Sequence, residues 1–173
     1  IGLVNQSFLN VFIGSIQDNH PPLYFLLLKL VTLLGQNEIF YRSLSFFASL
    51  GTLFFSYHIA RSLFNRHTAY LTASLMALSP YWIQSGNEIR GYSLVGFFTS
   101  GATFFLLKHY DRKKIWTSLF LVFSVLALYT EHFACFWILS IIGTLLLTNI
   151  NDSILRQLSR ILPYVAPLIF LIL

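Results

Sequence analysis

Long apolar stretches, separated by short polar segments, make up most of the chain. A helix of about 20 apolar residues crosses the roughly 30 Å hydrocarbon core of a bilayer, and about 17 residues is near the lower limit. Backbone N–H and C=O groups cannot stay unpaired in lipid, so we expect these stretches to be helices that cross a membrane. The pattern predicts spans at residues 39–60, 69–83, 92–107, 115–130 and 133–148, and the start of another at 161–173.

The apolar stretch at residues 23–34 is predicted to lie along the membrane surface. At about 1.5 Å per residue it is too short to cross, and Lys29 interrupts it. Pro22 suits the first turn of a helix, and Gly35 suits a position just beyond its C-terminal end. We therefore predict an interfacial helix at residues 23–34, within an outer loop formed by residues 1–38.

Positive charges indicate which ends of the spans face the cytoplasm. Of the eleven Lys and Arg residues, all except Lys29, Arg42 and Arg90 lie in short segments at the same ends of the spans. By the positive-inside rule, those ends are cytoplasmic. The predicted cytoplasmic segments are 61–68, 108–114 and 149–160, and the predicted extracytoplasmic ones are 1–38, 84–91 and the break at 131–132.

The composition indicates a single all-α, multispanning membrane domain over residues 1–173. Hydrophobic residues make up 56% of the chain and charged residues only 10%, which is too few to coat a soluble domain. The net charge of +5 sits in short loops, so it indicates topology and not nucleic-acid binding. Cys135 is the only cysteine, which excludes an intrachain disulfide, and no glycine-rich nucleotide-binding motif occurs.

Polar residues of the outer face form three constellations. The first lies at residues 18–24 and reads DNHPPLY. Its two prolines stiffen the turn and hold Asp18 and His20 at the membrane surface, ahead of Tyr24. The alternative is a turn that begins a helix, with Asp18 and His20 merely facing water.

The second constellation contains Glu88, Arg90 and Tyr92. A planar guanidinium is suited to a pair of phosphate oxygens, and Tyr92 fits an interfacial aromatic belt. The alternative is an interfacial ion pair or an arginine that extends toward water. Glu38 and Arg42 stand four residues apart at a predicted helix start, and we interpret them mainly as a structural ion pair.

The third constellation, Glu131 and His132, interrupts a long apolar stretch. Such a pair is costly at membrane depth unless it faces protein or a water-filled cavity. It could bind a metal or support a catalytic group, and a plain turn between two helices explains it equally well.

Taken in order, these motifs resemble those of GT-C glycosyltransferases, most closely the protein O-mannosyltransferases (glycosyltransferase family 39) and their bacterial relatives, which include the aminoarabinose transferases of lipid A. The likeness covers nearly the whole chain. The matching positions are Asp18-x-His20-Pro21-Pro22-Leu23-Tyr24, Gly35, Glu38, Arg42, Leu78-Ser79-Pro80, Glu88-x-Arg90-x-Tyr92-Ser93-Leu94 and Leu128-Tyr129-Thr130.

The resemblance implies a multispanning enzyme of the plasma (inner) membrane that takes a sugar from a polyprenyl-phosphate carrier. Transfer to an acceptor hydroxyl would occur on the extracytoplasmic face, usually with inversion at the anomeric carbon. The acceptor could be protein, lipid or polysaccharide. A divalent metal occurs at the site in some relatives, and the sequence neither requires nor excludes one here.

One feature departs from the resemblance. Such relatives carry an acidic motif shortly before the His-Pro-Pro segment, and its Asp is the expected catalytic base, but residues 1–17 contain no Asp or Glu. We therefore expect the chain to begin after that motif, with Asp18 and His20 as secondary catalytic residues. The predicted substrate-binding residues are Tyr24, Glu88, Arg90, Tyr92, Glu131 and His132.

Two other classes of protein also fit the residues. A transporter or flippase for polyprenyl phosphate or an anionic solute would use the same Glu, Arg and His side chains without chemistry. A non-enzymatic membrane subunit that has lost its catalytic motif is the second alternative. An Asp-Glu pair in the segment preceding residue 1 would favour the enzyme.

Overall fold

The computed structural model describes residues 7–17, 20–35, 37–108 and 114–147, and within them every regular element is a helix. This confirms the all-α prediction for the described part of the chain. The helices are α1 (Phe8–Gln17), α2 (Leu23–Thr32), α3 (Glu38–Leu63), α4 (Arg66–Leu78), α5 (Pro80–Asn87), α6 (Tyr92–Lys108), α7 (Lys114–Thr130) and α8 (Ala134–Leu147).

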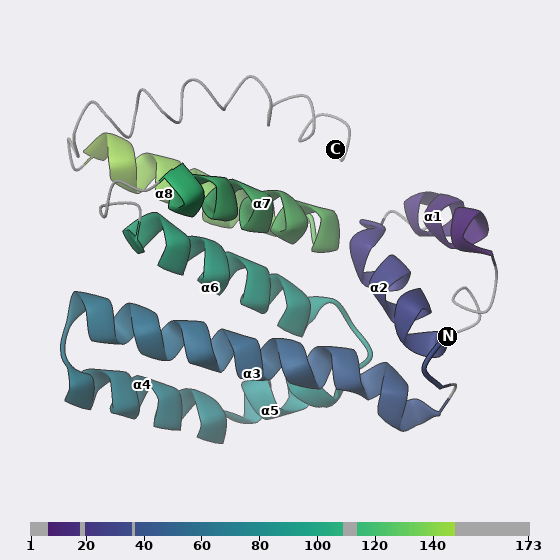
Figure 1. Ribbon diagram of the computed structural model, residues 1–173, viewed down its shortest axis with the longest axis horizontal. Helices are drawn as coiled ribbons and strands as arrows, with labels where there is room; N and C mark the ends of the chain where they lie inside the picture. Colours follow the sequence, from purple (N-terminus) through teal and green to yellow (C-terminus); the bar gives the residue numbers. More distant parts are fainter. Residues whose placement is uncertain (1–6, 18–19, 36, 109–113, 148–173) are drawn as a thin grey trace.

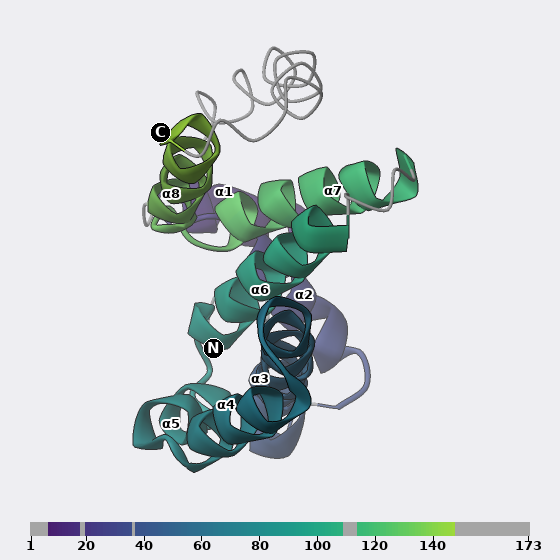
Figure 2. The ribbon, with the colours of Figure 1, turned by 90° about the vertical axis from the view of Figure 1, so that its left-hand side faces the viewer.

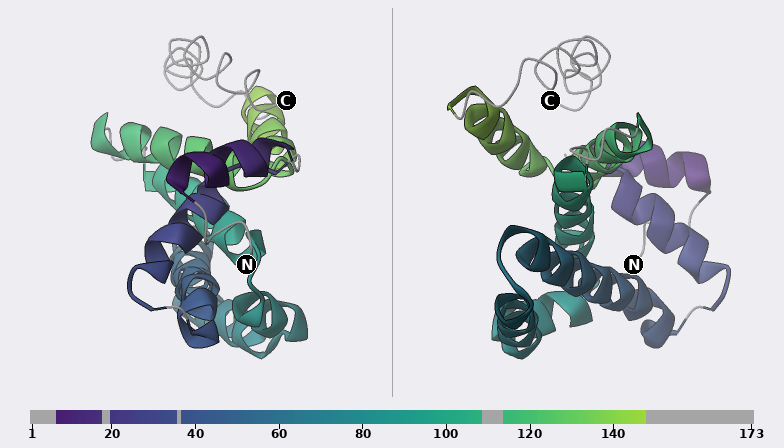
Figure 3. Two further views of the ribbon diagram at one scale, coloured as in Figure 1. Left: turned by 90° about the vertical axis from the view of Figure 1, so that its right-hand side faces the viewer. Right: turned by 60° about the vertical axis from the view of Figure 1, so that its left-hand side comes forward.

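The longest helices run side by side in successive layers. Seen along the bundle, α4 and α5 lie on one side of α3, and α6, α7 and α8 follow on the other (Figures 1 and 2). The short helices α1 and α2 sit together at one end, where α2 packs on α3 and α7 (Figure 3). Helix α2 therefore covers one end of the bundle (Figure 3).

Small residues let the central helices approach closely. Gly51 on α3 lies directly against the ring of Phe97, and Gly101 on α6 against the ring of Phe123. A side chain at either glycine would collide with an aromatic ring, as expected where helices pack through small residues. Phe55 lies among the same aromatic rings, so the centre of the bundle is packed mainly by phenylalanine.

Helix α3 has 26 residues and matches the predicted span at 39–60. Within the described residues it is the single helix that is both long and apolar enough to cross a membrane by itself. The predicted spans at 92–107, 115–130 and 133–148 coincide with α6, α7 and α8, although these helices are shorter than α3. The stretch at 161–173 lies outside the described residues.

The predicted span at 69–83 is wrong as one helix. The structure divides it into α4 and α5, with Ser79 extended between them (φ −68°, ψ 121°) and Pro80 in the first turn of α5. Proline disfavours the helical conformation in the residue before it and is well tolerated at a helix start, which explains the division. Helix α4 alone has 13 residues and is thus only about 20 Å long.

The predicted interfacial helix at 23–34 is present but shorter. Helix α2 ends at Thr32, and Leu33 and Leu34 continue in a turn before Gly35. Tyr24 and Leu28 are its buried residues and belong to the core formed with α3, α6 and α7. The sequence did not predict α1, which lies within the outer loop and packs on α2.

Candidate functional site

The turn before α2 places His20 at the surface of the bundle. Pro21 and Pro22 are buried, whereas His20 is exposed and its backbone N–H donates to the carbonyl of Ser15 at 2.9 Å. The ring of His20 lies 6.2 Å from that of Phe25. Asp18 lies outside the described residues, so its place in the site stays a prediction.

Arg90 belongs to the short segment between α5 and α6. Its carbonyl accepts a hydrogen bond of 3.3 Å from the Ser45 hydroxyl on α3. Its guanidinium carbon lies 5.8 Å from the centre of the Tyr92 ring, a cation–π contact. The Arg90 side chain is exposed and extends from a backbone that α3 fixes.

A cavity of about 360 Å³ joins the three constellations. Its volume falls within the range of small-molecule sites, about 300–1,000 Å³. It brings together residues that are distant in sequence, from the turn before α2, the segment between α5 and α6, and the end of α7. The residues lining it are His20, Pro21, Tyr24, Phe25, Ile89, Arg90, Gly91, Tyr92, Thr130 and Glu131.

Glu131 is the one carboxylate among the described residues that line this cavity. Burial raises the pKa of its carboxyl group, and the nearby His20 and His132 partly oppose that rise. Gly91 makes room for it, because a Cβ at position 91 would lie 3.0 Å from Glu131 Oε1. The cavity is therefore lined by a partly buried carboxyl group, from Glu131, and by the Arg90 cation.

Tyr24 forms part of the cavity wall but keeps its hydroxyl buried. The residue is 4% exposed, and its hydroxyl oxygen has no hydrogen-bond partner among the described residues. Burial raises the pKa of Tyr24 to about 12, against a small opposing effect of Ser45. The Ser45 hydroxyl donates its hydrogen bond to the Arg90 carbonyl. Because its pKa is raised by burial, Tyr24 is a neutral phenol at neutral pH.

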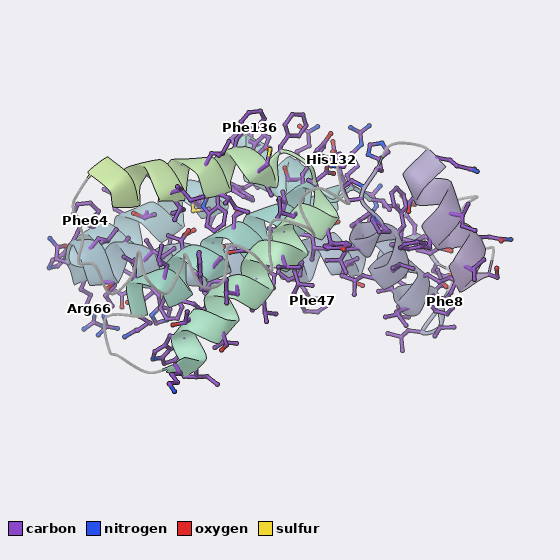
Figure 4. The ribbon with its side chains drawn as sticks, turned by 90° about the horizontal axis from the view of Figure 1, so that it is seen from above. Phe8, Phe47, Phe64, Arg66, His132 and Phe136 are labelled. Carbon is purple, nitrogen blue, oxygen red and sulfur yellow. The ribbon has the colours of Figure 1, made fainter. Side chains whose placement is uncertain are left out.

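Two predicted residues do not line the cavity. The Glu88 carboxylate accepts a 2.7 Å hydrogen bond from the side chain of Gln84, one helical turn earlier on α5. Its predicted contact with substrate stays a prediction. His132 lies where α7 meets α8, close enough to act on the charge of Glu131 (Figure 4).

A second cavity, of about 230 Å³, lies between α3, α4 and α5 and is mostly apolar. None of its lining residues is titratable, and it contains none of the predicted site residues. In the described part of the chain, moreover, no three His, Cys, Asp or Glu side chains gather closely enough to hold a metal ion. A divalent metal at the first cavity thus stays a prediction.

Comparison with known protein families identifies the chain. The sequence model of dolichyl-phosphate-mannose-protein mannosyltransferases matches residues 19–173. The chain belongs to this mannosyltransferase family. The match includes every cavity residue of the first site, from His20 to Glu131.

Membership implies a glycosyltransferase of the mannosyltransferase type. Together with the long apolar helix α3, it also indicates a membrane protein. No curated protein and no solved structure matches the chain significantly.

Sequence reasoning assigned no role in the site to Ser45, Gly91 or Thr130. Ser45 donates to the Arg90 carbonyl, and a Cβ at Gly91 would lie close to the Glu131 carboxylate and to Thr130 Cγ2. Two of the three had a signal in the sequence: Gly91 adjoins Arg90, and Thr130 ends the motif Leu128-Tyr129-Thr130 next to Glu131. Nothing in the sequence around Ser45 distinguishes it from the other serines of α3.

Proposed function

We propose that this mannosyltransferase-family chain belongs to a multispanning GT-C enzyme that transfers a sugar from a polyprenyl-phosphate donor to an acceptor hydroxyl. The acceptor is a protein, and the reaction takes place on the extracytoplasmic face with inversion at the anomeric carbon. The observation that supports this most directly is the cavity that joins Arg90, His20 and Glu131.

The reaction is a single in-line displacement. The acceptor oxygen forms a bond to the anomeric carbon as the bond from that carbon to the phosphate oxygen breaks, and its electron pair passes to the phosphate. A carboxylate takes the proton of the acceptor hydroxyl, a contribution typically of about 10²–10⁴-fold. The resemblance assigns that base to an acidic motif preceding Asp18.

Arg90 contacts the departing lipid phosphate in this mechanism. Negative charge develops on that phosphate in the transition state, and a fixed cation close to it lowers the barrier. Arg90 fits because it is exposed and lines the cavity, and because a planar guanidinium matches a pair of phosphate oxygens. His20, with Asp18, orients the donor or acceptor at the rim.

Replacing Arg90 by alanine in the full-length protein tests this role. We expect sugar transfer to fall by about 10²–10³-fold, the usual effect of removing one charge-stabilising donor, and donor affinity to weaken. Arg66→Ala is the matched control, because Arg66 also lies over a tyrosine ring, Tyr70, at 5.5 Å. It lies at the opposite end of the bundle from His132 (Figure 4) and should leave transfer unchanged.

Unchanged turnover and donor affinity in Arg90→Ala would remove Arg90 from the mechanism. A wild-type protein that binds or moves the lipid donor but transfers no sugar would favour the transporter or flippase. The two assays, donor binding and sugar transfer, must therefore be made on the same preparations.

A further inference from the structure

The segment that carries Arg90 depends on side chains of neighbouring helices for its shape. Helix α5 ends at Asn87, and the last carbonyls of a helix need donors from outside it. Two side-chain donors serve carbonyls of this last turn: Arg42 Nη1 reaches the Asn87 carbonyl at 2.6 Å, and the Ser93 hydroxyl, from α6, donates to the carbonyl of Ser85 at 2.5 Å. A third donor, the Ser45 hydroxyl, reaches the Arg90 carbonyl, beyond the end of α5, at 3.3 Å.

Arg42 is the charged member of these anchors. Its Nε and Nη2 also bind one oxygen of Glu38, at 3.1 and 2.6 Å, which confirms the predicted ion pair. The two side chains are 46% and 67% exposed, and exposed pairs with this spacing contribute only about 0.3–0.5 kcal/mol. The pair orients Arg42 more than it stabilises the fold, and the third guanidinium nitrogen reaches another helix.

The end of α5 favours this contact. The C-terminus of a helix carries partial negative charge, so a guanidinium there is stabilised by the helix dipole as well as by the hydrogen bond. Glu38, Arg42 and Ser45 follow at helical spacing and share one face of α3. One face of one helix thus fixes both ends of the segment from Asn87 to Arg90.

We propose that Glu38 and Arg42, together with Ser45, are positioning residues that set the direction of the Arg90 side chain. In the described residues, the Arg90 guanidinium forms no ion pair and lies over the Tyr92 ring. Its direction is therefore decided by its own backbone, which α3 holds. The link to catalysis rests on the proposed contact of Arg90 with the donor phosphate, whereas the anchoring itself does not.

Hydrogen exchange in the full-length protein measures the anchoring directly. In Arg42→Ala, we expect the amides of residues 88–91 to exchange several-fold faster, while those in the middle of α3 and α6 keep their protection. Arg61→Ala, at the other end of the same helix, should leave the segment unchanged. Equal exchange at residues 88–91 in Arg42→Ala and wild type would overturn the proposal.

A charge exchange separates anchoring from simple helix stabilisation. The double variant Glu38→Arg/Arg42→Glu keeps opposite charges four residues apart, but a carboxylate at position 42 cannot donate to the Asn87 carbonyl. We expect this variant to exchange as fast at residues 88–91 as Arg42→Ala. Wild-type protection of the amides of residues 88–91 in this double variant would show that the ion pair stabilises only the start of α3, and it would contradict the proposal.

A double-mutant cycle connects the anchoring to function. We expect Arg42→Ala to weaken binding of a polyprenyl-phosphate donor by about 5- to 10-fold in the wild-type background and hardly at all when Arg90 is already alanine. Fully additive losses would contradict a role through Arg90. If Arg90→Ala itself leaves binding unchanged, the proposed function fails, and the exchange measurements still decide whether Arg42 holds the segment.

Discussion

Charged residues of the outer face were the most predictable part of the site. In a chain this apolar, a group such as Arg90 or Glu131 must find water, a partner or a cavity, so its presence alone indicates a polar place. The hydrogen-bond partners were not predictable: Glu88, for example, accepts from the Gln84 side chain, which the sequence did not indicate. The sequence did not identify Ser45 as a hydrogen-bond donor to the site, because serine residues also occur at positions where they only fill space between helices.

The partly buried carboxyl group of Glu131 should affect how the stability of the protein depends on pH. Because burial raises its pKa, the folded protein binds a proton at Glu131 more readily than the unfolded chain does. Proton binding at Glu131 stabilises the folded protein, and the whole of this stabilisation is present at pH values below the ordinary pKa of a carboxyl group. The stabilisation is lost as the pH rises through the raised pKa of Glu131. Glu131→Gln should therefore unfold at a higher temperature than wild type at pH 7, by at most about 2–4 °C.

The difference should shrink as the pH is lowered toward 4, where the wild-type carboxyl is neutral as well. Thermal unfolding of both proteins over pH 4–8 in detergent measures it. A glutamine variant that is less stable than wild type at pH 7 would mean that the ionised carboxylate is favourably paired, contrary to this account.

At the scale of helices, the pattern of apolar residues does not fix every helix end, and proline decides one of them. The pattern gave the approximate ends of α2, α3, α6, α7 and α8, but Pro80 divides one predicted span into α4 and α5. Helix α1 was missed because its sequence is only weakly separated from its flanks by polarity. Helix packing against α2, and not local sequence, gives that segment its place.

The segment between α5 and α6 yields a second prediction, at Gly91. A Cβ at this position would lie 3.0 Å from Glu131 Oε1 and 3.3 Å from Thr130 Cγ2, so these two side chains would have to move slightly to make room. Gly91→Ala should displace Glu131 and lower sugar transfer by about 10-fold or more. Transfer assays with the purified variant test this.

Gly143 on α8 provides the matched control, because a Cβ there would meet nothing within 4 Å among the described residues. Gly143→Ala should keep wild-type transfer and, by helix propensity, unfold slightly later than wild type. If both alanine variants behave alike, the close approach at Gly91 has no bearing on the site.

For the molecule as a whole, the pattern of charges predicted which loops lie together. The segments expected outside the cell, around His20, Arg90 and Glu131, meet at one end of the bundle and form the cavity. Arg66, from a segment expected in the cytoplasm, lies at the other end, far from His132 in Figure 4. What could not be predicted is that α2 closes this end, since that depends on its packing with α3 and α7.

Thiol labelling of intact cells tests this arrangement. In a background with Cys135, the sole cysteine of the sequence, replaced by alanine, His20→Cys and Arg90→Cys should react with a membrane-impermeant reagent added outside. Arg66→Cys should react only after the membrane is permeabilised. Opposite sidedness of positions 20 and 90 would refute a shared extracytoplasmic site.

The cavity has walls from residues 20–25, 89–92 and 130–131, which span most of the described chain. During synthesis these walls emerge from the ribosome at widely separated times. A nascent chain that ends after α6 still lacks Glu131, so the pocket can be completed only after α7 has been made. Ribosomes stalled before that point should carry the earlier helices without a complete cavity for the proposed donor.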